Sequence, residues 1–254
     1  MRKIIKLFES GNVLVCGLRG TGKDVLMGNV INRRSKPYVS NLDYSHGQWF
    51  TRIDFNSIDL GGNTYKDMIS GDVKFYQYPY ELGSDIYISD AGVYFPSQYC
   101  NELNKAYPNF PFYFALSRQV SHNNVHVNVQ NLNRCWDKIR EQSDIYIRCR
   151  FCVVLFGFVF QGITIYDKYE SCLQRCKPCL VSLPLFPSKE QRLQYQMYKD
   201  NFENQHGKIK NRFLIYRNKS LHDTYYFEKL FKGGKKNEKQ KITFVSGLSS
   251  NDYC

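Results

Sequence analysis

The sequence lacks a hydrophobic run long enough to span a membrane. Its longest apolar stretch, residues 151–160, is interrupted by Gly157 and falls well short of the about 20 residues that a membrane-spanning helix needs. The first ten residues start with basic side chains but contain no apolar segment of the length found in secretory signal peptides. These two absences predict a cytoplasmic protein that reaches a membrane only through a partner or a surface patch.

The nine cysteines are an odd number and follow no secretory signal, which favours free thiols in a reducing cytoplasm over a disulfide framework. A zinc site is the alternative, because Cys149 and Cys152 form one close pair and Cys176 and Cys179 form another. The 23 residues between the pairs exceed the usual spacing of about 15–20. Strand periodicity would also place Cys149 and Cys152 on opposite faces, so free thiols are the favoured interpretation.

Negative charge is scarce relative to positive charge. The 254 residues include 35 Lys and Arg against 23 Asp and Glu, a formal net charge of +12, which predicts a polyanionic partner. The hydrophobic fraction of 43% excludes a wholly disordered chain. Tyr (20) and Phe (18) are abundant and could stack on bases, although A/T-rich codons encode the same residue types and are the simpler explanation.

Strand-like and helix-like segments alternate through the first half of the chain, and this rhythm predicts an α/β fold with a mainly parallel sheet flanked by helices. Short apolar runs predict strands, and apolar residues at helical spacing predict helices. The predicted strands are residues 12–16, 36–42, 86–90 and 125–130, and the predicted helices are residues 24–34 and 96–107.

The composition changes after about residue 145. Residues 145–166 are rich in β-branched and aromatic side chains and predict a hairpin, while residues 189–204 predict a polar helix and residues 213–216 a late strand. We expect a small β-rich or mixed C-terminal appendage, followed by a basic tail whose lysines either grip phosphates or remain solvated. The predicted division is 1–166 for the main domain, 167–231 for the appendage and 232–254 for the flexible tail.

Residues 17–23, GLRGTGK, fit the phosphate-binding pattern G-x-x-x-x-G-K between a predicted strand and a predicted helix. Glycines let the backbone curl so that its N–H groups face phosphate oxygens, and the helix presents its positive end. The sequence therefore predicts a P-loop NTPase core that binds ATP. The predicted nucleotide contacts are Gly17, Arg19, Gly20, Thr21, Gly22, Lys23 and Asp24, with Lys23 reaching the β- and γ-phosphates.

Two acidic residues are candidate ligands for Mg²⁺. Asp24 stands where the motif has Ser or Thr, and it could either bind the cation or stabilise the helix N-terminus. Asp90 ends the apolar run at residues 86–88, in the position of the acid that holds Mg²⁺ through water. The following residue is Ala91, which puts hydrolysis by the usual route in doubt. Gln130 ends another strand and could orient a water or sense the γ-phosphate, or be an amide without a role.

These segments together resemble the zonula occludens toxin-like (Zot-like) assembly ATPases of filamentous phages. The resemblance covers about residues 12–166, and a weak similarity continues at residues 222–224. The similar segments are the loop at 17–23, YVSNL at 38–42, ISDAGVYFP at 88–96, SRQ at 117–119, NVHVNVQ at 124–130 and DKIR at 137–140.

The resemblance implies an ATPase of the additional-strand class that assembles in homo-oligomeric rings and drives assembly, export or packaging of viral single-stranded DNA. It implies a location in the host cytoplasm, with the host inner membrane reached through partner proteins. Catalysis would use Lys23, Asp90 and Gln130. Arg118, Arg134 and Arg140 are candidates for an arginine finger, although on so basic a chain a solvated or nucleic-acid-facing side chain is the simpler interpretation of each.

The chain departs from the family at Asp24, at Ala91, at Gln119, which replaces His, and in lacking a transmembrane segment after the ATPase domain. One alternative is therefore an ATP-binding scaffold that does not hydrolyse its ligand. A P-loop kinase is a weaker alternative, because no Arg-rich lid or acceptor pocket is evident.

Overall fold

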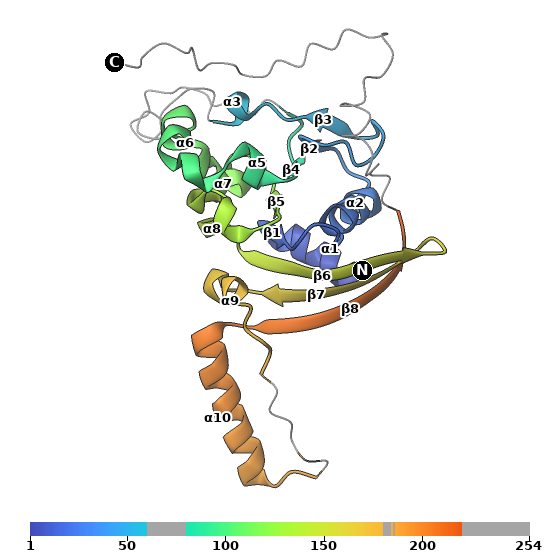
Figure 1. Ribbon diagram of the computed structural model, residues 1–254, viewed down its shortest axis with the longest axis vertical. Helices are drawn as coiled ribbons and strands as arrows, with labels where there is room; N and C mark the ends of the chain where they lie inside the picture. The colour runs from blue at the N-terminus through green and yellow to red at the C-terminus, as the bar shows by residue number, and fades with distance from the viewer. Residues whose placement is uncertain (60–79, 180–183, 185, 220–254) are drawn as a thin grey trace. The chain divides into compact units, whose positions relative to one another are not determined.

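The computed structural model describes residues 1–59, 80–179, 184 and 186–219. The predicted basic tail at 232–254 and the segment at 222–224 lie outside these residues. One sheet organises the described part of the chain (Figure 1). Its strands are β1 (Val13–Cys16), β2 (Tyr38–Ser40), β3 (Phe50–Arg52), β4 (Asp85–Ile88), β5 (Val125–Val129), β6 (Ile145–Leu155), β7 (Phe158–Tyr166) and β8 (Ile209–Arg217).

The strand order is β3-β2-β4-β5-β1-β6-β7-β8. The first five pairings in this order are parallel, and the last two are antiparallel. Strands β1, β2, β4 and β5 are buried along their whole length, as expected when helices cover both faces of a parallel sheet. The predicted α/β class with a mainly parallel sheet is confirmed.

Helices lie on both faces of this sheet (Figure 1). One hydrophobic core includes α1 and α2, and the other includes residues of α5 to α9. The helices are α1 (Arg2–Ser10), α2 (Lys23–Arg34), α3 (Phe55–Ile58), α5 (Ala91–Tyr94), α6 (Cys100–Ala106), α7 (Phe110–Ser121), α8 (Asp137–Glu141), α9 (Tyr169–Leu173) and α10 (Lys189–His206). No helix in the described ranges has the length and apolar composition needed to cross a membrane.

Some helices differ from the prediction. The segment predicted as one helix at 96–107 forms a 3₁₀ turn, Ser97–Tyr99, followed by α6. Helix α1 was not predicted, although Ile4 and Phe8 are four residues apart and are both buried.

The hairpin formed by β6 and β7 contains an irregularity beside the P-loop. Cys149 pairs with Ile163, whereas Phe151 pairs with Gly162, so Arg150 is an extra residue in β6. Such a bulge shifts the alternation of side chains by one residue. The prediction that Cys149 and Cys152 lie on opposite faces is therefore wrong. Both side chains lie on the face of the sheet that carries the P-loop.

Strand β8 pairs with β7 along its whole length, from Ile209 opposite Tyr166 to Arg217 opposite Phe158. The described residues after 166 thus add a strand to the same sheet. The exact division of the chain into domains stays a prediction.

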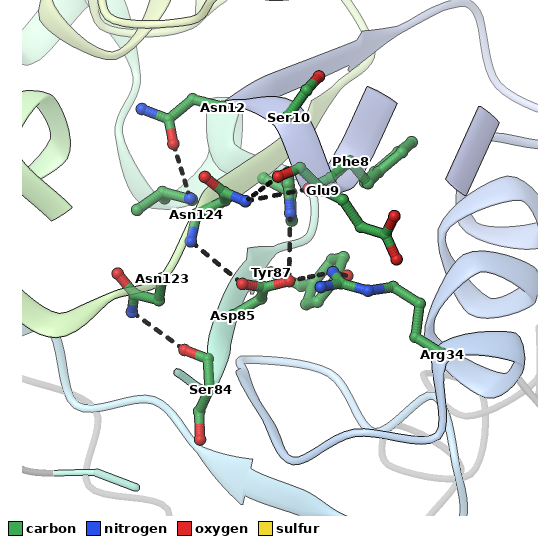
Figure 2. A network of polar contacts seen from close by, with 12 residues as sticks. Phe8, Glu9, Ser10, Asn12, Arg34, Ser84, Asp85, Tyr87, Asn123 and Asn124 are labelled. Carbon is green, nitrogen blue, oxygen red and sulfur yellow. Dashed lines mark hydrogen bonds and ion pairs between the residues drawn. The ribbon is translucent and has the colours of Figure 1, made fainter. Parts of the chain in front are cut away.

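A buried polar network lies at the amino-terminal ends of β4 and β5 (Figure 2). Asp85 forms an ion pair with Arg34 of α2 and accepts a hydrogen bond from the backbone N–H of Asn124 at 3.1 Å. His126 Nε2 lies 3.7 Å from the same carboxylate, and Arg34 also donates to the Tyr87 hydroxyl at 3.0 Å. The network therefore joins α2, β4 and β5.

Candidate phosphate-binding site

The P-loop leaves β1 at Cys16 and enters α2 at Lys23, as the sequence predicts. Gly20 and Gly22 have φ angles of 79° and 81°, in the left-handed region that favours glycine. A Cβ atom at Gly20 would meet no atom within 4 Å, so the loop backbone is open there. This is the arrangement that lets backbone N–H groups approach an anion.

The carbonyl of Leu18 organises the interior of the loop. It accepts hydrogen bonds from the Thr21 backbone N–H at 3.3 Å, from Thr21 Oγ1 at 2.7 Å and from Lys23 Nζ at 3.3 Å. Lys23 is only 5% exposed, so its ammonium group is held against the loop. A phosphate group would offer this cation a stronger, charge-assisted partner than the carbonyl.

A cavity of about 350 Å³ opens beside the loop at the carboxyl ends of β1, β4 and β5. It brings together three residues that the sequence predicted for the site: Arg19, Asp90 and Gln130. Lys23 and Asp24 are not among the residues that line it. The lining residues are Leu18, Arg19, Asp90, Gly92, Val93, Gln130, Asn131 and Arg134.

Asp24 lies in a polar cluster rather than at the cavity wall. Its Oδ1 accepts hydrogen bonds from Asn128 Nδ2 at 2.7 Å, Ser89 Oγ at 2.9 Å and the Tyr44 hydroxyl at 3.0 Å. Three donors on one carboxylate oxygen compensate the charge that an acid adds beside a phosphate site. Tyr44 is fully buried, and this burial together with the Asp24 charge raises the pKa of the phenol.

Asn128 connects this cluster to Asp90. Besides donating to Asp24, it accepts a hydrogen bond from the Asp90 backbone N–H at 2.7 Å. Asp90 has φ 48° and ψ 48°, a left-handed conformation that is uncommon outside glycine, and the Asn128 contact helps to hold it. Asn41 holds Ser89 through two hydrogen bonds. The Ser89 backbone N–H donates to Asn41 Oδ1 at 2.7 Å, and Asn41 Nδ2 donates to the Ser89 carbonyl at 2.9 Å.

The sequence predicted site roles for the P-loop, Asp90 and Gln130, but none for Tyr44, Ser89 or Asn128. Ser89, Asn41 and Asn128 lie within segments that carried the family resemblance. Their position at the ends of buried parallel strands was the available signal, because those ends meet at one edge of the sheet. Tyr44 follows a strand end and offered no comparable signal.

The three candidate finger arginines lie in different surroundings. Arg134 lines the cavity with Asp90 and Gln130. Arg118 forms a half-exposed ion pair with Asp144 at 3.1 Å, and Arg140 donates to the Leu132 carbonyl and the Tyr169 hydroxyl at 3.2 and 2.8 Å. Within one chain, Arg134 is therefore the candidate that the structure places at the site.

The four cysteines proposed for zinc do not gather. Among the described residues, no group of three or more His, Cys, Asp or Glu side chains is placed to hold a metal ion. Cys149 is buried behind the P-loop, where burial raises the pKa of its thiol. Cys176 contacts His206 Nδ1 at 3.7 Å. The zinc alternative finds no support in this arrangement.

The carboxylates of Asp90 and Asp24 remain the groups that could hold Mg²⁺ near the loop. Both are hard oxygen ligands of the kind that Mg²⁺ prefers. Asp90 lines the cavity, whereas one oxygen of Asp24 already accepts three hydrogen bonds. The arrangement fits a cation bound primarily through Asp90.

No protein-family model matches the chain, and no curated protein matches it. The chain is similar to the N-terminal domain of zonular occludens toxin from Neisseria meningitidis, with 13% identity over 69% of this chain and 95% of that chain and a TM-score of 0.37. It is also similar to the genome packaging NTPase B204 from Sulfolobus turreted icosahedral virus 2 in complex with AMPPCP, with 12% identity over 63% and 93% of the two chains and a TM-score of 0.39.

A third similar structure is the cytoplasmic domain of the Thermomonospora curvata type VII secretion ATPase EccC, with 13% identity, 56% of this chain and 21% of that chain covered, and a TM-score of 0.32. Similarity at these levels is too low to transfer a function. The functional interpretation therefore depends on the P-loop and the cavity of this chain.

Proposed function

We propose that the chain is a nucleoside triphosphatase that binds Mg²⁺ and ATP at the P-loop and the adjoining cavity. The observation that carries this proposal is the convergence of the glycine loop, the buried Lys23 and the Asp90–Gln130–Arg134 cavity at one edge of the sheet. A glycine turn that merely links a strand to a helix would not require an acid and an amide at the same place.

Each group then has a physical role. The N-terminus of α2, the loop amides and Lys23 bind the β- and γ-phosphates. Asp90 would hold Mg²⁺, and the cation would neutralise charge on the phosphate oxygens. Gln130 orients the attacking water. Because an amide cannot take up a proton, the water proton leaves with a phosphate oxygen. Arg134 stabilises the charge that develops on the transferred phosphoryl group.

The binding experiment measures the dissociation constant of a non-hydrolysable ATP analogue with Mg²⁺. We expect Lys23→Ala to weaken binding by at least tenfold, because it removes the charge-assisted contact to phosphate. Lys105→Ala, at an exposed position of α6, is the matched control and should bind normally. Equal affinity of the wild type and Lys23→Ala would contradict the site assignment.

A second function is favoured by Ala91, which leaves the position after Asp90 without a carboxylate. In this alternative the chain binds ATP but does not hydrolyse it, and acts as a nucleotide-dependent scaffold. Phosphate release by the wild type that disappears in Asp90→Ala would exclude the scaffold. Binding without any turnover would favour it.

We propose that the polymer moved by this triphosphatase is single-stranded nucleic acid and that the movement takes place during virus assembly. A ring of these chains would carry it out and would reach a membrane through partner proteins. Support comes from strands β6 to β8, which contain five Arg or Lys residues and no Asp or Glu. Phe151 and Phe213 are exposed there with ring centroids 6.0 Å apart. Cations and exposed rings on an antiparallel sheet suit a backbone phosphate and unstacked bases.

The test is fluorescence anisotropy of a labelled thymidine oligonucleotide. Replacing both Phe151 and Phe213 with Ala should weaken binding by at least tenfold, since stacking contributes about 1–3 kcal/mol per base. Phe186→Ala, which removes a 93% exposed ring outside the sheet, is the matched control. Unchanged affinity of the double variant would reject this surface as the binding site.

A further inference from the structure

Gln161 of β7 reaches from the antiparallel part of the sheet to the backbone of the P-loop. Its side-chain amide donates to the Gly22 carbonyl at 2.9 Å and to the Thr21 carbonyl at 3.3 Å. The side chain is completely buried. Burying a polar amide costs free energy unless its hydrogen-bonding atoms find partners away from water. The Gln161 nitrogen finds these partners in two successive carbonyls of the glycine loop.

The oxygen of the Gln161 amide faces Tyr216 of β8. The Tyr216 hydroxyl donates to Gln161 Oε1 at 2.8 Å, which leaves the nitrogen facing the loop. Tyr216 is only 6% exposed, so the whole chain of contacts from β8 through β7 to the P-loop is shielded from water. Hydrogen bonds in such surroundings are stronger than at the surface.

The same part of β6 and β7 presses against Gly22. A Cβ atom at Gly22 would lie 2.4 Å from Cys152 Cβ and 2.9 Å from Gln161 Nε2. The β6 bulge directs Cys152 toward this contact. The loop thus lies against a wall made by β6 and β7, and Gln161 is the polar group of that wall.

The direction of the two carbonyls has a consequence for the amides. In a trans peptide the C=O and the N–H of one unit point in opposite directions. When Gln161 holds the carbonyls of Thr21 and Gly22 on its own side, the N–H groups of Gly22 and Lys23 are turned away from it. That is the side on which a phosphate would bind to the loop.

We propose that Gln161 is a positioning residue that fixes the P-loop peptides in the orientation needed to bind phosphate and couples the loop to β7 and β8. The proposal rests on the nucleotide-binding function proposed above. It adds that the antiparallel extension controls the affinity of the loop, although none of its residues touches the nucleotide.

The experiment compares Gln161→Met, which keeps the length of the side chain but donates no hydrogen bond, with Tyr216→Phe, which keeps the Gln161 donor. We expect Gln161→Met to weaken binding of the ATP analogue by at least tenfold and Tyr216→Phe by less than about threefold. A residue that only stabilises the fold would instead lower Tm in both variants and leave both affinities unchanged, which would overturn the proposal.

Two further measurements keep the outcome decisive. If Gln161→Met folds poorly because the Tyr216 hydroxyl has lost its acceptor, the double variant Gln161→Met/Tyr216→Phe removes that buried hydroxyl and should bind as weakly as the expected single variant. Hydrogen exchange of residues 17–26 without nucleotide should be faster in Gln161→Met than in the wild type. A wild type that binds no nucleotide would refute the proposed function, whereas unchanged exchange in Gln161→Met would refute the role of Gln161.

Discussion

A single residue, Asp24, gives the site its unusual electrostatics. The phosphate loop has an acid where the motif has a hydroxyl, and the structure compensates that acid with donors from three elements or loops: Tyr44, Ser89 and Asn128. The cluster also reaches Asp90 through Asn128. Asp24 therefore acts as an anchor that ties the start of α2 to the end of β4 through β5.

This anchor predicts different effects for two substitutions of Asp24. Asp24→Asn retains an oxygen that can accept from the three donors, whereas Asp24→Ser is too short to reach them. We expect Asp24→Ser to lower the free energy of unfolding by about 2–3 kcal/mol, because buried donors lose their acceptor, and Asp24→Asn by less than half of that. Chemical denaturation measures both.

The comparison has a clear contrary outcome. If Asp24→Ser restores the hydroxyl ligand of the motif, nucleotide affinity would rise in the presence of Mg²⁺ without a loss of stability. That result would show that Asp24 is a replaced metal ligand and not an anchor.

Arg134 is a second case in which one side chain can be tested. It lines the cavity with Asp90 and Gln130, where it would stabilise charge in the transition state. We expect Arg134→Ala to lower kcat by at least tenfold while the dissociation constant of the ATP analogue changes less than threefold. Arg118→Ala, on an exposed ion pair, should leave kcat unchanged within a factor of two. An equal loss in both variants would remove Arg134 from the site.

At the scale of elements, the P-loop is confined by the hairpin beside it. Gly20 and Gly22 have nearly the same φ angle, but only Gly22 lies against Cys152 and Gln161. Gly20→Ala should cost about 1–2 kcal/mol from the left-handed backbone alone. Gly22→Ala adds a clash, so we expect a larger loss and no measurable nucleotide binding.

Thermal unfolding and nucleotide titration of both variants check this difference. The double variant Gly22→Ala/Cys152→Gly removes the closest side-chain atoms from the new methyl group and should recover part of the lost stability. Equal destabilisation by the two single substitutions would mean that the hairpin does not restrict the loop.

The polar network at the amino end of β4 and β5 predicts a pH dependence of stability. Burial lowers the pKa of His126 below its usual value. For Asp85, burial alone would raise the pKa, but His126 and the Arg34 charge outweigh it and hold the pKa below its usual range. A group with a lowered folded-state pKa stabilises the protein above its unfolded pKa, and this stability is lost as the pH falls.

Stability should therefore decline below about pH 6.5, where an unfolded His begins to bind a proton, and further below about pH 4, where an unfolded Asp binds a proton more readily than Asp85 does in the folded protein. The variant His126→Gln should lose most of the change in Tm between pH 7.5 and pH 5. His122→Gln, which replaces an exposed histidine, should keep it. A wild-type Tm that rises on acidification would contradict the role assigned to this network.

Local patterns in the sequence predicted the central elements well, because apolar strands and the glycine loop are specified by neighbouring residues. The P-loop, the start of α2 and the strands at residues 13–16, 85–88 and 125–129 follow directly from such patterns. Cys149 and Cys152 did not, since a single extra residue, Arg150, reverses the alternation on which the prediction depended. The contacts of Asp24 with Ser89 and of Gln161 with Gly22 join residues more than 60 positions apart, and no local pattern encodes them.

At the scale of the whole chain, part of the positive charge behind the net charge of +12 lies in strands β6 to β8. These strands contribute Arg148, Arg150, Lys210, Arg212 and Arg217 without a carboxylate among them. The sheet therefore joins two functions in one continuous hydrogen-bonded structure: the phosphate loop at β1 and a basic, partly aromatic extension that begins at the neighbouring strand β6.

This arrangement predicts that charge and stacking contribute separately to binding of a single strand. Arg150 and Arg217 are both exposed, and Arg217 lies opposite Phe158 in the β7–β8 pairing. If each contacts a phosphate, replacing either with Gln should reduce the slope of log affinity against log salt by about 0.7. The Phe151→Ala/Phe213→Ala variant should bind more weakly with an unchanged slope, because stacking releases no counterions. Anisotropy titrations at four salt concentrations separate the two effects, and a slope that stays the same in both arginine variants would place the phosphate contacts elsewhere on the chain.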